Sequence, residues 1–265
     1  MRRRPQRSAA ANSPSLIFGV HPVTELLRAA PESIERVWVG EGTEAARVRG
    51  EAARAGVAVE TTDRATLDRM TSGGRHQNVA ARARPFAYAD LADVLARGPA
   101  LVVALDGVTD PQNLGAIVRS AEVLGAGALI LPRDRSAPVT PAAIRASAGA
   151  TAHLPIVQVV NLTRALGEAK ERGYWIVGLA PAGSSEFQEL PALERAVLVV
   201  GSEDKGARPL VRETCDFLVR IPQRGRVESL NASVAAAIGI YGLRERLVRA
   251  SKPPGSGGPA TPASS

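Results

Sequence analysis

Three polar segments follow apolar runs that predict buried strands, at the places where open α/β sheets bind their ligands. They are LDGVTDPQNLGAIVRS at 105–120, LVVGSEDKG at 198–206 and IPQRGRVESLNASVA at 221–235. Arginine, carboxylate, amide and hydroxyl side chains occur in them, and such groups can bind phosphate, orient a substrate and move a proton. A functional site is therefore expected at the carboxyl edge of a sheet.

Each segment also has an ordinary structural explanation when it is taken alone. Asn113 fits a helix cap and Arg119 a solvated helix arginine, while Glu203 fits an acidic turn. Asn231 fits a second cap. A cap does not explain a loop rich in backbone donors and acceptors that leads into a helix as apolar as 234–240.

The common cofactor and nucleophile motifs are missing from the sequence. No G-x-G-x-x-G follows a predicted strand, and no G-x-S-x-G surrounds a serine. Gly201 and Gly206 have the spacing of a P-loop, but Ala207 and Arg208 stand where lysine and serine or threonine are needed. ATP chemistry is therefore not supported.

The charge of the chain favours nucleic acid as a partner. The 265 residues carry a formal net charge of +7, and all but three of the 33 basic residues are arginine. Arginine binds phosphate through a rigid fork of N–H donors. A coding bias toward arginine remains an alternative source of this composition.

The cysteine and histidine content indicates no metal site and a reducing compartment. Cys215 is the only cysteine, and His21, His76 and His153 lack the spacing of metal ligands. No apolar stretch approaches the roughly 18–20 residues that cross a bilayer. The apolar run 16–20 is too short for a signal peptide. A cytoplasmic protein is expected.

The elements that must position the polar segments alternate along the chain. Residues 1–14 form a basic tail and 251–265 a low-complexity tail; between them lie a compact αβ unit at 15–84, a linker at 85–99 and a longer α/β array at 100–250. Alternating β and α signals in that array predict a mostly parallel sheet covered on both faces.

Apolar periodicity sets the expected element bounds. Helices are expected after Pro22 and at 43–55, 63–70, 90–96, 113–124, 141–146, 162–171 and 230–248, and strands at 34–39, 57–60, 79–83, 100–105, 128–131, 154–159, 174–179, 196–200 and 217–221.

Together and in this order, the three segments closely resemble the motifs of the SpoU-type RNA 2′-O-ribose methyltransferases of the SPOUT superfamily. The matching features are the pair Asn113 and Arg119, the G-S-E-x-K-G turn and the E-S-L-N-x-S-V-A run, and the resemblance covers roughly 16–249. It implies an α/β fold whose C-terminal methyltransferase domain contains a trefoil knot, which no sequence rule alone would propose.

The first unit resembles the L30e-like substrate-binding domain attached to family members that act on large-subunit rRNA. The matching residues are the run 19–23 and the tripeptide 75–77. Similar tRNA guanosine methylases typically lack this domain, so the resemblance favours a guanosine of 23S rRNA. Two positions depart from the family pattern, namely Asn78, where glycine is usual, and Gln112, where histidine is common.

The resemblance implies methyl transfer from S-adenosylmethionine to a ribose 2′-hydroxyl. In such proteins the residue matching Arg119 is the proposed proton acceptor or hydroxyl activator. Because arginine is normally locked as a cation, we favour a milder role. Arg119 would grip the adjacent phosphate or polarise the hydroxyl, and the side-chain oxygen of Asn113 would fix its guanidinium.

The same resemblance assigns the remaining site residues. Arginine and ribose would be positioned by Glu203, Ser229 and Asn231, and the cofactor's adenine would be held near Gly201, Ile221 and Leu230. RNA contacts are expected at Arg75, Arg224 and Arg226, for which solvated loop arginines are the alternative. A homodimer is implied as well.

Two alternative functions remain open at this stage. The same chemistry could act on tRNA or on an rRNA adenosine. Alternatively, a non-catalytic RNA-binding or ribosome-assembly protein could keep this fold without the reaction. The second alternative predicts a damaged polar set, whereas all five residues assigned to catalysis are present in the sequence.

Overall fold

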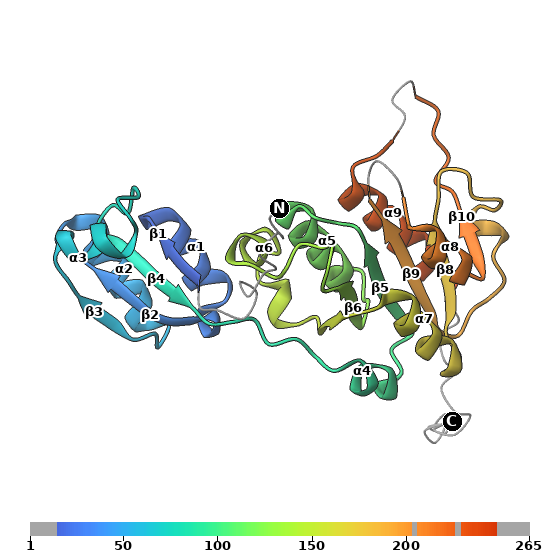
Figure 1. Cartoon of the computed structure of the whole chain (residues 1–265), viewed down its shortest axis with the longest axis horizontal. Coiled ribbons are helices and arrows are strands. Elements are labelled where there is room, and N and C mark those ends of the chain that lie inside the picture. Colours follow the sequence, from blue (N-terminus) through green and yellow to red (C-terminus); the bar gives the residue numbers. More distant parts are fainter. Residues whose placement is uncertain (1–14, 203–205, 226–228, 248–265) are drawn as a thin grey trace, which may run out of the picture.

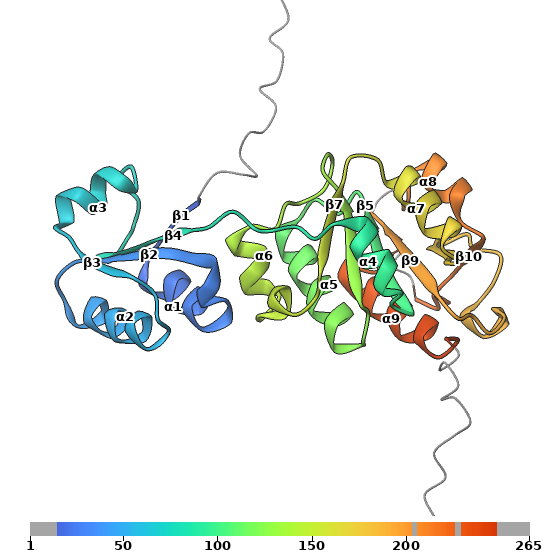
Figure 2. The same cartoon turned by 90° about the horizontal axis from the view of Figure 1, so that it is seen from below.

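Two α/β units follow one another along the chain and are joined by an extended segment (Figures 1 and 2). The computed structural model describes residues 15–202, 206–225 and 229–247. The first unit holds a four-stranded sheet and the second a six-stranded sheet. The two predicted tails, at 1–14 and 251–265, lie outside the described residues.

The first unit is a mixed sheet with helices packed against it. Its elements are β1 (Ser15–Phe18), α1 (Val20–Ala29), the 3-10 turn η2 (Pro31–Ser33), β2 (Ile34–Val39), α2 (Thr43–Arg54), β3 (Val59–Thr61), α3 (Arg64–Met70) and β4 (Val79–Ala83). The strand order is β1-β4-β2-β3, with β4 antiparallel to both neighbours and β2 parallel to β3. The crossover through α2 makes the parallel pair, because parallel strands need a long connection.

The second unit carries the three polar segments. Its elements are α4 (Leu91–Arg97), β5 (Leu101–Asp106), α5 (Pro111–Val123), β6 (Ala128–Pro132), α6 (Pro141–Ala146), η3 (Ala150–Ala152), β7 (Ile156–Val159), α7 (Leu162–Glu171), β8 (Trp175–Leu179), η4 (Phe187–Glu189), β9 (Ala196–Gly201), α8 (Pro209–Thr214), β10 (Phe217–Val219) and α9 (Ala232–Arg244).

Every strand pair of the second sheet is parallel, in the order β10-β8-β9-β5-β6-β7. The expected parallel sheet is therefore confirmed. Apolar residues of α5, α6 and α9 pack in one core cluster, and those of α4, α7 and α8 pack in another. Both faces of the sheet are covered, and all carboxyl ends of its strands meet at one edge.

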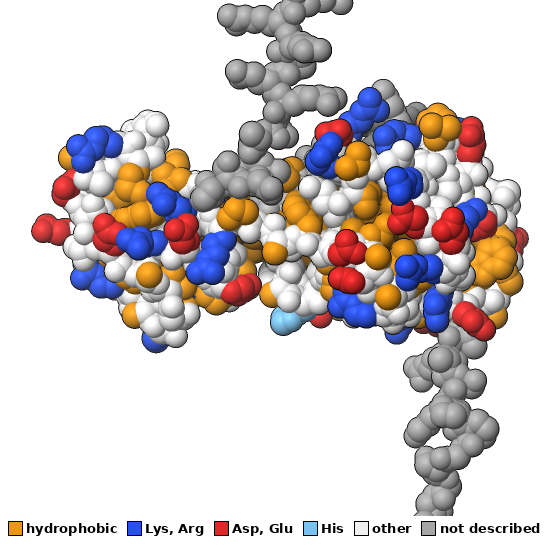
Figure 3. All heavy atoms as spheres, turned by 60° about the horizontal axis from the view of Figure 1, so that its bottom comes forward, with side chains coloured by type: hydrophobic (Ala, Val, Ile, Leu, Met, Phe, Trp, Pro, Cys, Tyr) orange, Lys and Arg blue, Asp and Glu red, His pale blue; other side chains and the backbone are white. Residues whose placement is uncertain are grey.

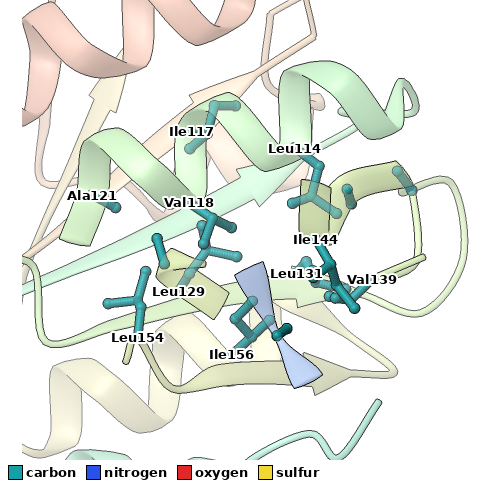
Figure 4. Packing of buried hydrophobic residues seen from close by; sticks show 14 of the residues in the cluster. Leu114, Ile117, Val118, Ala121, Leu129, Leu131, Val139, Ile144, Leu154 and Ile156 are labelled. Carbon is teal, nitrogen blue, oxygen red and sulfur yellow. The ribbon is translucent and has the colours of Figure 1, made fainter. Parts of the chain in front are cut away.

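The core under α5 is aliphatic and tightly filled (Figure 4). Leu114, Ile117, Val118 and Ala121 form the buried stripe of α5, and they pack with the strand residues beneath them. Gly115 lies where α6 crosses, because a Cβ there would stand 2.4 Å from the carbonyl oxygen of Ala143. This contact sets how closely α5 and α6 approach each other.

Helix α5 begins earlier than expected, and its cap is a different residue. The sequence suggested Asn113 as the cap, but Asp110 holds that position. Its carboxylate accepts the backbone N–H groups of Gln112 at 3.1 Å and Asn113 at 3.3 Å. Pro111 occupies the first helical position, where its missing N–H costs nothing. Asn113 is thereby released from capping and lies inside the first turn.

The segment expected as a linker at 85–99 packs against the second unit. Ala89 pairs with Val157 as an additional parallel bridge, and the hydroxyl of Tyr88 accepts the backbone N–H of Val139 at 3.1 Å. Phe86 meets Tyr88 edge to face with centroids 5.1 Å apart. Helices α1 and α6 also touch across the two units. The connection is therefore anchored at one end.

Within the described ranges, no helix is long and apolar enough to cross a membrane. The same ranges contain no group of three or more His, Cys, Asp and Glu side chains that could hold a metal ion.

Candidate active site

A cavity of about 230 Å³ lies at the carboxyl edge, beyond the ends of β8, β9 and β10. Its walls come from the loop after β8, the turn after β9 and the segment that leads into α9. Gly201, Ile221 and Leu230 all line it, and Ser229 lines it too. The structure thus brings together three residues predicted for one ligand and one predicted for catalysis.

Apolar side chains and backbone groups dominate this cavity. Leu179, Val200 and Val219 contribute further apolar wall, while Ser202 and Gln223 supply the polar side chains besides Ser229. No charged side chain of the described residues lines it. Such a site suits a flat, partly apolar ligand that is recognised through backbone donors and acceptors.

The turn after β9 closes tightly on itself. The backbone N–H of Ser202 donates to the carbonyl of Gly206 at 3.1 Å, and the N–H of Gly206 donates back at 2.9 Å. A Cβ on Gly201 would stand 2.0 Å from the carbonyl carbon of Gly206, so the closure requires glycine. Glu203, predicted for catalysis, lies within this turn but outside the described residues.

An ion pair ties the same turn to the end of β5. Asp106 is 1% exposed, and its two carboxylate oxygens accept the backbone N–H and the Nε–H of Arg208, each at 2.7 Å. A buried carboxylate is strongly destabilising unless it is paired and hydrogen-bonded. The pair therefore fixes where the chain leaves the turn, 102 residues after β5.

Two predicted residues from distant segments meet beside the cavity. The Nδ2 of Asn231 donates to the Oδ1 of Asn113 at 3.0 Å. The Oδ1 of Asn231 accepts the backbone N–H of Ser233 at 2.9 Å, which caps α9. Because the cap uses the oxygen of Asn231, its amide nitrogen must face Asn113.

Arg119 is exposed on α5, and it makes no hydrogen bond or ion pair with any part of the chain that the structure describes. Six helical residues advance about 9 Å and turn through about 600°, so Arg119 and Asn113 leave the helix on different faces. The side-chain oxygen of Asn113 instead accepts a hydrogen bond from Asn231. Asn113 does not hold the guanidinium in this structure.

The residues predicted to bind RNA are dispersed. Arg224 is exposed on the loop that supplies Gln223 to the cavity, whereas Arg75 is exposed in the first unit. Arg75 precedes the buried His76, whose Nε2 lies 2.8 Å from the carboxylate of Asp68. Arg226 lies outside the described residues.

Sequence reasoning missed two parts of this site. It assigned no functional role to Asp106, although a carboxylate that ends an otherwise apolar strand signals a buried charge in need of a partner. It also passed over the loop after β8, where Ala180 and Pro181 line the cavity. The position of that loop after a parallel strand was the available signal.

Two family models match the chain, one on each unit. The model described as the SpoU rRNA Methylase family matches residues 100–241. The model described as RNA 2′-O ribose methyltransferase substrate binding matches residues 16–89. A protein of Mycobacterium ulcerans (strain Agy99) named uncharacterized tRNA/rRNA methyltransferase is 43% identical over 244 residues, which span 89% of this chain and 78% of that protein.

Solved structures resemble the chain to different extents. An AdoMet-bound rRNA methyltransferase from Sinorhizobium meliloti has a TM-score of 0.66 at 26% identity, covering 89% of this chain and 88% of its own. A TrmH/SpoU tRNA modifying enzyme from A. aeolicus has a TM-score of 0.51 at 32% identity, covering 59% of this chain and 80% of its own. The match to the rRNA methyltransferase spans both units, whereas the match to the tRNA modifying enzyme covers a smaller share of this chain.

Proposed function

The chain belongs to the SpoU rRNA methylase family, and from that premise we propose that it transfers a methyl group from S-adenosylmethionine to a ribose 2′-hydroxyl of large-subunit rRNA. The observation that carries the proposal is the single cavity lined by Gly201, Ile221 and Leu230. It lies beside the contact between Asn113 and Asn231.

The residues of the cavity fit S-adenosylmethionine. Leu179, Ile221 and Leu230 provide apolar walls for the adenine, and the glycine at 201 lets backbone approach the ligand closely. The bound sulfonium supplies an electrophilic methyl group. Among the described residues, the lining of the cavity carries no charged side chain that would pair with that cation.

The chain's own residues would orient the substrate. Ser229 lines the cavity, and Asn231 and Asn113 contact each other. Their hydroxyl and amide groups would hold the ribose hydroxyls. Glu203 is likewise proposed to position the arginine and the ribose. The exposed guanidinium of Arg119 would bind the adjacent phosphate or polarise the 2′-hydroxyl while remaining a cation.

The role of Arg119 has its own test. If Arg119 acts as a cation that binds phosphate or polarises the hydroxyl, Arg119→Lys should lower the activity and leave the shape of the pH–rate profile unchanged. If Arg119 acts as the base, the acidic limb of the pH–rate profile should shift instead, because the pKa of lysine is lower than that of arginine. A profile of the variant beside the native enzyme separates the two.

Large-subunit rRNA is the favoured substrate because of the first unit. The match to the rRNA methyltransferase of Sinorhizobium meliloti covers 89% of this chain, whereas the match to the tRNA modifying enzyme covers 59%. A guanosine is our specific proposal, with a tRNA or an rRNA adenosine as alternatives. RNA contacts would come from Arg75, Arg224 and Arg226, and the reaction would take place in the cytoplasm.

A homodimer and a trefoil knot complete the proposal. Val234, Ile238 and Tyr241 are 45%, 40% and 61% exposed, and their helical spacing puts them on one face of α9. Such an apolar stripe supports a self-association surface. Close backbone crossings support the knot, since a Cβ on Gly183 would stand 2.6 Å from the carbonyl carbon of Val219.

Cofactor binding and substrate choice can be tested together. Isothermal titration should show S-adenosylmethionine binding to the native chain and not to Leu230→Trp, which fills the cavity. Tritiated cofactor should label the rRNA, and not the tRNA, of a strain that lacks this gene. Label in tRNA alone would reject the rRNA proposal. Cofactor binding without transfer to either RNA would call for assembly intermediates as substrates, whereas neither binding nor transfer would favour a non-catalytic RNA-binding protein.

A further inference from the structure

A second and larger cavity lies at the same carboxyl edge, on the other side of β5 from the first. Its volume is about 770 Å³. The end of β6, the start of α7 and the start of α8 form its walls, through Pro132, Asp134, Arg135 and residues 160–163 and 208–211. Since β5 stands between β9 and β6, this groove and the proposed cofactor cavity flank the segment that holds Asn113.

Arg208 enters this groove in a fixed orientation. Its Nε–H and backbone N–H are held by the two oxygens of the buried Asp106, yet 43% of its side chain is exposed. Among the described residues, no hydrogen-bond or ion-pair acceptor meets its Nη1 or Nη2. The guanidinium therefore presents two orientated nitrogens to the groove. Because the side chain is already held in place, binding of an anion would cost little further conformational entropy.

The rest of the groove combines charge with exposed apolar surface. Arg135 is an exposed second cation in the lining, and Asp134 is its one acidic member among the described residues. Val160 and Leu210 are 70% and 67% exposed. Phosphate oxygens that alternate with the flat faces of bases match such a wall, as in a single RNA strand.

Basic and acidic side chains are interspersed over the face that Figure 3 presents, and the basic side chains form no single patch on that face. A diffuse field would attract RNA without placing it. Contacts that set the register of a strand must therefore come from individually held groups such as Arg208.

We infer that this groove is a subsite for the RNA strand next to the methylated nucleotide, in which Arg208 and Arg135 bind a phosphodiester and Asp106 is the positioning residue. The inference rests on the proposed function for the identity of the strand. A purely structural role for the ion pair would require only that a cation neutralise Asp106.

The first experiment measures RNA binding by the full chain at a series of salt concentrations, with a fluorescein-labelled single-stranded RNA 20-mer of mixed sequence. Arg135→Ala removes a cation without exposing the buried carboxylate. It should weaken binding about 5–10-fold and lower the salt slope by about one. The matched control is Arg172→Ala, an exposed arginine beyond the end of α7 at the opposite edge of the sheet, and it should leave both quantities unchanged.

Arg208→Lys separates phosphate binding from neutralisation of Asp106. Lysine keeps the charge but has no planar fork, so we expect KM for rRNA to rise about tenfold, a larger change than that in kcat. A merely structural pair predicts an unchanged KM. Unchanged RNA binding in Arg135→Ala together with unchanged KM in Arg208→Lys would overturn the inference.

The outcomes also separate this inference from the proposed function. If the native chain methylates rRNA and both variants behave as native, the subsite is wrong and the function stands. If the native chain neither binds S-adenosylmethionine nor transfers methyl groups, the function fails. The salt slopes of the variants would still decide whether the groove binds an RNA strand.

Discussion

Asn231 connects two elements through one side chain. Its oxygen caps α9 and its nitrogen donates to Asn113. Asn231→Ala should therefore cost about 1 kcal/mol of unfolding free energy, the usual value of a lost cap. It should also lower kcat by at least tenfold, because the ribose would lose a positioning group. Urea unfolding and single-turnover kinetics measure the two effects.

The matched control for that variant is Asp90→Ala. Asp90 caps α4 by accepting the backbone N–H groups of Ala92 and Asp93, and it does not line the cofactor cavity. Asp90→Ala should lower the free energy of unfolding by a similar amount and leave kcat unchanged. Equal losses of rate in both variants would mean that the effect of Asn231→Ala comes from stability alone.

Cys215 illustrates how burial controls reactivity in this chain. Burial in the first place, and then the carboxylate of Asp216, raise the pKa of its thiol to about 11. A raised pKa leaves the thiol protonated at pH 8, and the protonated form is the unreactive one. We expect alkylation by iodoacetamide in the folded protein to be far slower than that of free cysteine at pH 8. Its rate should rise with pH toward about 11; an inflection near 8.5 would contradict this.

Residue types and motif order predicted which distant residues would come together. Gly201, Ile221 and Leu230 share one cavity, and Asn113 meets Asn231, as a common site requires. The geometry between them could not be predicted, because it depends on contacts between residues more than a hundred positions apart. The pairing of Asp106 with Arg208 is the clearest example.

At the scale of elements, the crossing of α5 and α6 depends on Gly115. A Cβ there would stand 2.4 Å from both the Ala143 oxygen and the Ala146 Cβ. Gly115→Ala should therefore destabilise the fold by about 1–3 kcal/mol, as overpacking does, although alanine favours helix. Chemical unfolding monitored by circular dichroism gives the value.

An alanine at Gly167, on another helix, should have the opposite effect on stability. Gly167 lies within α7, and a Cβ there would meet no atom within 4 Å. Gly167→Ala should stabilise the fold by about 0.5–1 kcal/mol through helix propensity alone. If both alanine variants changed stability equally, the close packing of α5 on α6 would not be the cause.

Apolar runs and periodicity located most elements of the chain. The expected bounds of β2, α6 and α7 agree with the structure, and those of α2 agree within a residue. Strand β1 and helix α8, of 4 and 6 residues, were not expected. The start of α1 precedes Pro22, since proline is tolerated in a first helical turn.

At the scale of the whole molecule, the exposed stripe of α9 predicts self-association. Ile238→Asp places a charge on that stripe and should convert a dimer to a monomer in analytical ultracentrifugation. Trp175→Gln, at another exposed apolar residue on β8, is the control and should remain dimeric. A native chain that sediments as a monomer at micromolar concentration would contradict the proposed homodimer.

The sequence did not predict how strands pair in the first sheet or how the segment 85–99 packs. Alternating elements predicted a parallel second sheet, which is confirmed, but not the antiparallel pairing of β4 with β1 and β2. Nor did composition indicate that the segment at 85–99 would pair with β7 through Ala89. Both features arise from tertiary pairing, on which local periodicity carries no information.

The position of the transferred methyl group tests the central claim most directly. Large-subunit rRNA from a strain that lacks this gene would be incubated with the full chain and labelled S-adenosylmethionine, and then hydrolysed with alkali. A 2′-O-methyl ribose blocks cleavage of its own phosphodiester, so we predict that all label appears in alkali-resistant dinucleotides containing 2′-O-methylguanosine. Label in mononucleotides that carry a methylated base would contradict the account.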